Sequence, residues 1–217
     1  HVSVDTNATS LSGTGGNLQL GKGAGNWLFQ TGVTWRSPEL ELNDIGFQLR
    51  SDYLRYYGWI GYRTTKPFKK NRQWLYNYSH FLTYDFGGKL NDLMFNTNGW
   101  LNLKNNGWLN LSLDLVTNNF SNFLLRGGPR FKLPNVYAIG GRISTDNRKK
   151  LRFGANGSSQ WGSEDALRSF NFGGSITYQP TNALTISLSP NYTNLKDRLQ
   201  YVSTTSFDDT SRYILGT

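Results

Sequence analysis

A strict alternation of apolar and polar residues is the feature that most restricts how this chain can fold. In the segment 108–116, a leucine at every second position alternates with Asn110, Ser112 and Asp114. The segments 169–178 and 183–192 repeat the pattern. Successive side chains of a β-strand point to opposite faces, so a period of two predicts strands with one apolar face and one polar face.

The same alternation, broken by turn residues at roughly every 8 to 15 positions, predicts about thirteen strands and no helix. Only 6 Ala and 3 Glu stand against 24 Gly and 23 Asn, so residues that favour helices are scarce. Short connections between consecutive strands predict an antiparallel meander. The expected strands span residues 15–22, 26–35, 45–63, 73–86, 90–104, 108–116, 121–131, 135–144, 149–161, 169–178, 183–192, 197–207 and 211–217.

The alternation also predicts the pairing of one hairpin, between the strands expected at 90–104 and 108–116. Pairing Lys104 with Trp108 sets Leu103 opposite Leu109 and keeps the leucines on one face. A two-residue turn would shift the register by one residue and mix apolar with polar side chains on each face. We therefore expect a three-residue loop that ends in a left-handed Gly107.

Strand length and aromatic positions favour a membrane barrel over a soluble sandwich. The segments 73–86 and 90–104 exceed the ~5–6 residues of most soluble strands. From Trp74 to Tyr84 the chain spans roughly 33 Å, or roughly 25 Å at a tilt of about 40°, which is the height of a barrel's apolar band. The residues expected in its aromatic girdles are Trp74, Tyr76, Tyr78, Tyr84 and Phe86.

The expected fold class is therefore all-β, an antiparallel up-and-down transmembrane β-barrel. The polar face carries mainly small hydroxyl and amide residues, whereas a soluble sandwich, which stays the alternative, would carry charge on its outer face. The chain starts at His1 and stops at Thr217 within an expected strand. Because bacterial barrels usually have an even number of strands, we expect residues 1–217 to be one barrel domain from a longer chain of roughly 14 or more strands.

Two groups of polar-face residues are candidates for ligand binding in a lumen. Trp100 and Trp108 fall among amides, where indole faces could stack on sugar rings. The second group could line the pore and favour anionic solutes, because arginine rings commonly set anion preference. It consists of Arg55, Tyr57, Trp59 and Arg63. The alternative for the tryptophans is packing at the barrel rim or against an inserted plug.

The sequence offers little catalytic or metal chemistry. It contains no Cys, and His80 lies among aromatic residues without a recognisable orienting partner. We therefore expect no enzyme activity, no metal site and no cofactor. The formal net charge of +9 is spread over many turns. The basic segment 64–72 is expected to be a solvated loop, and the alternative is a loop that contacts lipopolysaccharide, an acidic glycan or a partner protein. Without a recognition helix or zinc module, no nucleic-acid partner is expected.

One segment carries a family resemblance. Its matching residues are Ser37, Pro38, Asn43, Asp44, Gly46, Phe47 and Asp52. The segment resembles a motif in a family of large Bacteroidota outer-membrane proteins of uncharacterised function. Members often carry an N-terminal domain similar to carbohydrate-binding module family 9, followed by a β-barrel. The resemblance implies a bacterial outer-membrane location and a connection with glycans. Independently of the family, Asn43, Asp44 and Gly46 form a turn signature.

These observations give three hypotheses for function. The first is a non-enzymatic outer-membrane barrel that acts as a channel or uptake component in glycan handling. The second is a structural barrel subunit of a larger envelope secretion or assembly complex. The third is a soluble, β-rich carbohydrate-binding protein. For the barrel, the expected partners are outer-membrane lipid and lipopolysaccharide, with glycans and other envelope proteins as further candidates.

Overall fold

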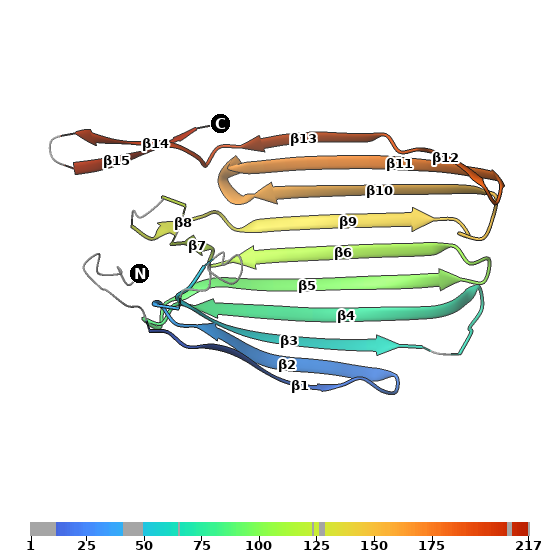
Figure 1. Ribbon diagram of the computed structural model, residues 1–217, viewed down its shortest axis with the longest axis horizontal. Helices are drawn as coiled ribbons and strands as arrows, with labels where there is room; N and C mark the ends of the chain where they lie inside the picture. Colours follow the sequence, from blue (N-terminus) through green and yellow to red (C-terminus); the bar gives the residue numbers. More distant parts are fainter. Residues whose placement is uncertain are drawn as a thin grey trace.

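The computed structural model describes residues 12–40, 50–64, 66–122, 124–125, 129–207 and 210–216. Within these ranges the regular structure is β-strand, apart from one short 3-10 turn, η1 Ser163–Asp165 (Figure 1). No helix in this part of the chain is long and apolar enough to cross a membrane. The strands are β1 Gly15–Lys22, β2 Trp27–Arg36, β3 Tyr53–Arg63, β4 Asn71–Tyr84, β5 Leu90–Leu103, β6 Trp108–Thr117, β7 Phe120–Ser121, β8 Phe131–Lys132, β9 Val136–Ser144, β10 Leu151–Gly162, β11 Leu167–Thr181, β12 Leu184–Leu188, β13 Asn191–Asp197, β14 Gln200–Phe207 and β15 Thr210–Gly216.

Eleven strands form one antiparallel sheet in which neighbours in sequence are neighbours in space. The order is β1-β2-β3-β4-β5-β6-β9-β10-β11-β12, and β13 pairs with the same edge of β11 as β12. Two further pairs, β7-β8 and β14-β15, stand apart from it. The expectation of an all-β antiparallel meander is therefore confirmed.

The last strand of the main sheet is one strand interrupted by a proline. Ile176 lies opposite Leu188 in β12, and Gly173 lies opposite Asn191 in β13, so both pieces keep one register with β11. Pro190, between them, has no amide hydrogen to donate. Its carbonyl still accepts a hydrogen bond from the Gly174 amide at 3.1 Å. A proline is tolerated in a strand chiefly at a sheet edge.

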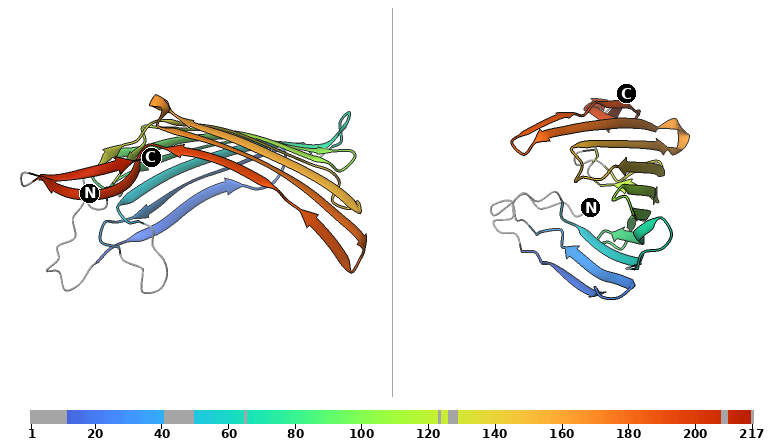
Figure 2. Two further views of the ribbon diagram at one scale, coloured as in Figure 1. Left: turned by 90° about the horizontal axis from the view of Figure 1, so that it is seen from above. Right: turned by 90° about the vertical axis from the view of Figure 1, so that its right-hand side faces the viewer.

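The sheet curves strongly but does not close. Viewed from its right-hand side, it bends into an arc whose two ends are formed by the first and last strands (Figure 2). Closure would require β1 to pair with the strand formed by β12 and β13, and no such pairing occurs among the described strands. The observed architecture is thus an open curved sheet, where the sequence pattern predicted a closed barrel.

Strand registers sort the side chains into two continuous faces. On the apolar face, Phe95, Leu115, Tyr137 and Trp161 lie opposite one another in β5, β6, β9 and β10. On the polar face, Trp100, Asn110, Arg142 and Asn156 lie opposite one another in the same four strands. Both faces therefore extend across strands that are far apart in sequence.

Within the described ranges, no second layer packs against the apolar face. Leu113 is 52% exposed, and many of its neighbours on this face are exposed to a similar extent. Among the described residues, Leu28, Leu125 and Ala166 are the only buried apolar side chains. A soluble domain of this length normally buries a contiguous apolar core. The described part of the chain instead presents its apolar side chains outward.

The polar face is held together by a chain of side-chain amides. The Asn77 amide donates to Asn98 Oδ1 at 2.9 Å, and the Asn98 amide donates to Asn96 Oδ1 at 2.8 Å. The Asn96 amide in turn donates to Asp114 Oδ1 at 2.6 Å. This amide chain crosses β4, β5 and β6, and the Trp59 indole of β3 joins it by donating to Asn77 Oδ1 at 3.2 Å. Networks of this kind fix side-chain orientation.

Two sequence predictions about connections were wrong. Leu101, not Leu103, lies opposite Leu109, and the left-handed residue in the turn is Asn106, with φ of 58°. The predicted faces survive because a shift of two residues preserves parity. The segment 121–131 is not a strand of the sheet. Its first and last residues belong to the separate two-residue strands β7 and β8, while β6 pairs directly with β9.

Asp146 links two adjacent hairpin turns at one end of the sheet. Its carboxylate is buried and accepts hydrogen bonds from Nε and Nη2 of the Arg148 guanidinium, from the backbone amide of Arg148, and from the Asn106 side-chain amide at 3.0 Å. The Arg148 side chain, then its backbone amide, hold the pKa of Asp146 well below its usual range. The turns between β5 and β6 and between β9 and β10 are thereby joined.

Replacing Asp146 by Asn should lower thermal stability at neutral pH. A depressed folded-state pKa contributes stability above the unfolded-state pKa of about 3.9, and this contribution is lost as pH falls further. The difference in unfolding midpoint between wild type and Asp146→Asn should therefore be present at pH 7 and shrink below about pH 4. A difference that does not depend on pH would contradict this role of the carboxylate.

Gly58 provides a second test of the packing, on the apolar face. A Cβ at this position would lie 2.5 Å from Cε1 of His80 on the opposing strand. A Cβ at Gly99, on the same face, would have its nearest neighbour at 3.9 Å. Overpacking costs typically ~1–3 kcal/mol, so Gly58→Val should lower the free energy of unfolding by about that amount. Gly99→Val should cost clearly less, and His80→Ala should restore part of the loss in Gly58→Val. Equal losses in the two glycine variants would refute the proposed contact.

Candidate functional site

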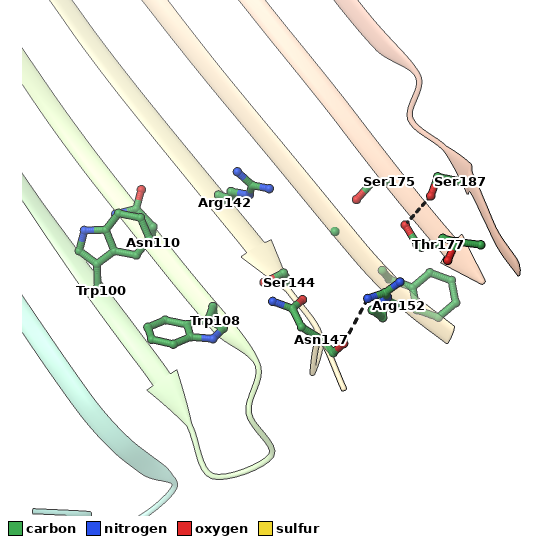
Figure 3. A pocket seen from close by; sticks show the side chains of 13 residues that line it. Trp100, Trp108, Asn110, Arg142, Ser144, Asn147, Arg152, Ser175, Thr177 and Ser187 are labelled. Atoms are coloured by element: carbon green, nitrogen blue, oxygen red, sulfur yellow. Dashed lines mark hydrogen bonds between the residues drawn. The ribbon is translucent and has the colours of Figure 1, made fainter. Parts of the chain in front are cut away.

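The polar face carries a pocket of about 650 Å³ near the end of the sheet where Asp146 joins the turns. It is lined from β5, β6, β9, β10, β11 and β12 and by Asn147 of the turn between β9 and β10 (Figure 3). The lining combines two indoles, two guanidinium groups and a set of hydroxyl and amide groups. The side chains labelled in Figure 3 are Trp100, Trp108, Asn110, Arg142, Ser144, Asn147, Arg152, Ser175, Thr177 and Ser187.

Strand registers bring these residues together. Asn110 lies between Trp100 and Arg142, and Trp108 lies opposite Ser144. Gly154 follows Ser144 across the sheet, and because it has no side chain, the Ser175 hydroxyl can lie close to its backbone. A Cβ there would approach Ser175 Oγ to 2.6 Å. The pocket therefore depends on the same parity that separates the two faces.

The two tryptophans lie on the polar face, as predicted, and both line the pocket. Trp100 is 41% exposed and Trp108 is 38% exposed, so a large part of each ring can contact a ligand. The Trp100 indole nitrogen donates to Asn98 Oδ1 at 3.1 Å. That bond connects Trp100 to the amide chain, so the ring is held in place before any ligand arrives.

The arginines of the pocket were missed by the sequence analysis. Arg142 is exposed and makes no hydrogen bond or ion pair with any described residue. Arg152 donates through Nη1 to the carbonyl of Asn147 at 3.2 Å, but its Nε is buried without a partner. No carboxylate of a described residue lines the pocket, and Asp146 nearby is already engaged by Arg148. The pocket is therefore positively charged.

The second predicted group lies on the same polar face, but not in this pocket. Arg55 donates to Thr83 Oγ1 at 3.0 Å, Tyr57 to Gln19 Oε1 at 3.2 Å, and Arg63 to the Gly25 carbonyl at 3.0 Å. Trp59, which joins the amide chain, also lines a smaller pocket of about 350 Å³ beside β1. Strand β4 separates this group from Trp100 in β5, and β4 and β5 together separate it from Trp108 in β6.

The predicted girdle residues of β4 share the apolar face. Trp74, Tyr76, Tyr78 and Tyr84 alternate along the strand, whereas Phe86 lies in the turn that follows β4. Further aromatic pairs occur towards both ends of this face. The ring centroids of Tyr62 and Trp74 are 5.2 Å apart at one end, and those of Tyr137 and Trp161 are 6.0 Å apart at the other.

Cationic side chains gather beyond one end of the apolar face. Arg168 and Lys196 lie opposite each other in β11 and β13 and, with Arg198, surround Asp165. Burial raises the pKa of Asp165, but the charges of Arg168 and Lys196 outweigh it, and the net shift is downward. Three cations face the Asp165 carboxylate, and Glu164 and Asp197 lie beside these residues in the sequence, so this corner of the sheet carries a cluster of opposite charges.

The motif residues that fall in the described ranges have structural roles. Ser37 closes the ends of β1 and β2, since its Oγ accepts from the Thr14 amide at 2.8 Å. Asp52 adopts a φ of 57°, and its carboxylate accepts from the Phe86 amide at 2.9 Å. Pro38 lies in the turn after β2. Asn43, Asp44, Gly46 and Phe47 lie outside the described residues.

His80 lies on the apolar face, between Tyr56 and Tyr78. Its ring centroid is 5.6 Å from that of Tyr56 and 5.9 Å from that of Tyr78. The described residues contain no cluster of three or more His, Asp or Glu side chains that could hold a metal ion. The contacts of His80 are those of a packing residue.

The whole chain matches one protein family. No curated protein and no solved structure matches the sequence. One family model does match, over residues 1–217, and its description is a domain of unknown function. The chain therefore belongs to the DUF5916 family.

Proposed function

We propose that the curved sheet is part of the wall of a transmembrane β-barrel in a bacterial outer membrane. Its apolar face would contact lipid, and its polar face would line an aqueous lumen. The observation that carries this proposal is the uncovered apolar face, combined with the near absence of buried apolar side chains in the described part of the chain. The resemblance to outer-membrane proteins at Ser37, Pro38 and Asp52 points in the same direction.

Energetics argue that this face needs a cover. Eight aliphatic and aromatic side chains of this face are each more than 40% exposed. In water, each of them forgoes about 1 kcal/mol or more of the transfer free energy that it would gain if it were covered. Together this is on the order of 10 kcal/mol, the size of a domain's whole net stability. The residues are Leu111, Leu113, Ile139, Ile143, Phe170, Phe172, Ile176 and Ile186.

Lipid fits this face better than a protein partner does. The ten residues of β6 span roughly 33 Å, or roughly 25 Å along the membrane normal at a tilt of about 40°. Aromatic pairs towards both ends of the face suit the two interfaces of a bilayer. The cations around Asp165 lie where anionic headgroups of lipopolysaccharide would be found.

The polar face supports a non-enzymatic channel or uptake component for glycans. Trp100 and Trp108 offer exposed indole faces, and neighbouring amides and hydroxyls can bind sugar hydroxyl groups. The strands needed to close the barrel would pair with β1 and with the edge formed by β12 and β13. Such a barrel would let solute pass beside the pocket.

A charge placed on the apolar face should disrupt the protein, and the same charge on the polar face should not. Leu113→Arg would put a guanidinium near the bilayer midplane, at a cost of ~2–4 kcal/mol. Ser112→Arg, at the preceding position of the same strand, would point its guanidinium into the lumen. We expect only Leu113→Arg to reduce the folded, heat-modifiable form in purified outer membranes. Equal behaviour of the two variants, or a folded protein that needs no detergent, would contradict the membrane assignment.

Planar-bilayer recording distinguishes a channel from a structural subunit of an envelope complex. The complete purified protein should produce discrete conductance steps, because a barrel of this size encloses water. Persistent silence, with the heat-modifiable fold intact, would contradict the channel and favour the structural subunit.

A further inference from the structure

We infer that the pocket on the polar face binds an acidic saccharide, with its sugar rings against Trp100 and Trp108 and its carboxylate against Arg142 and Arg152. This inference rests on the proposed function, since it names the solute class of the proposed channel. Of the residues in this pocket, the sequence pattern indicated only the two tryptophans, and it did not predict the charge of a ligand bound there.

The arginines point to an anion. Arg142 has no partner among the described residues, and Arg152 holds a buried Nε that donates to nothing. Leaving a buried donor unpaired is unfavourable, and an anionic oxygen is the strongest partner that a guanidinium can find. With no carboxylate in the lining, the charge of both arginines remains available to a ligand.

The tryptophans point to a sugar ring and not to a free anion. Two half-exposed indoles on neighbouring strands provide apolar area that inorganic phosphate could not use. A pyranose ring has an apolar face that packs on an indole and hydroxyl groups around its edge. Asn110, Ser144 and Ser175 lie between the tryptophans and the side of the pocket formed by β12, where they can bind such hydroxyls.

The dimensions fit a short oligosaccharide. A volume of about 650 Å³ lies within the ~300–1,000 Å³ range typical of small-molecule sites. The bond from Trp100 to Asn98, and the hydrogen bond from Arg152 to Asn147, fix two walls of the site in advance. Preorganisation of this kind reduces the entropic cost of binding.

Binding can be measured through the intrinsic fluorescence of the tryptophans. The complete protein, purified in detergent, would be titrated with trisaccharides of galacturonate, glucuronate and mannuronate. Neutral trisaccharides of galactose, glucose and mannose, and inorganic phosphate, serve as comparison ligands. We expect at least one uronate to bind saturably, about tenfold or more tighter than its neutral counterpart and than phosphate.

Variants locate the binding. Arg142→Gln and Arg152→Gln should each weaken the uronate about tenfold and leave the neutral sugar nearly unchanged. Trp108→Leu should weaken both. Arg72→Gln removes the same charge from an exposed position at the start of β4, at the same end of the sheet. Arg72 donates there to the Lys104 carbonyl, and the substitution should change the affinity less than twofold.

Several results would overturn the inference. These are no binding by any uronate, equal binding of neutral sugars or phosphate, and equal weakening by Arg72→Gln and Arg142→Gln. The assay needs no intact membrane, so uronate binding by a silent barrel would refute the channel and keep the site. Conductance that uronates do not affect, with no uronate binding, would keep the channel and refute the site.

Discussion

The registers of the main sheet preserve one parity over the middle of every strand pair, with irregularities near the ends of the β4–β5 and β11–β12 pairs, and the rest of the structure depends on this constraint. Leu113 lies opposite Thr97 on one side and Ile139 on the other, so the apolar side chains of β5, β6 and β9 share a face. A slip of one residue in any pair would reverse the faces of all strands beyond it. The uncovered apolar face, the amide chain and the charged pocket all follow from the absence of such a slip.

The two faces of the sheet differ in what their side chains contact. The apolar face presents Leu, Ile and aromatic side chains with no core to receive them, so it requires an apolar environment. On the polar face, side chains satisfy one another, as where Asn77 and Trp100 both donate to Asn98 Oδ1. Arg142 and Arg152 are the exceptions in the pocket, since part of their donor capacity is unused. That contrast is the physical basis for assigning a ligand to this region.

Alternation in the sequence was sufficient to predict strands and faces, but not exact pairing. The strand expected at 15–22 is β1, and the polar-face placement of Trp100 and Trp108 was confirmed. The predicted pairing of the hairpin at 104–107 was wrong by two residues, because a shift by an even number of residues leaves the alternation of the faces unchanged. The meeting of Arg142 and Arg152 with the tryptophans was not predicted, because it depends on registers summed across several strands. The open edges likewise depend on pairings that alternation does not specify.

The central claim is that the two faces of the sheet meet lipid and water respectively. Since the chain contains no Cys, single cysteines can be placed at each position from 109 to 116 of β6 and labelled with an environment-sensitive fluorophore. Quenchers attached to lipid tails and dissolved in water would then be compared in reconstituted bilayers. The account predicts a period of two, with lipid quenching at Leu109, Leu111, Leu113 and Leu115 and aqueous quenching at the residues between them. Uniform quenching along the strand, or the opposite phase, would contradict it.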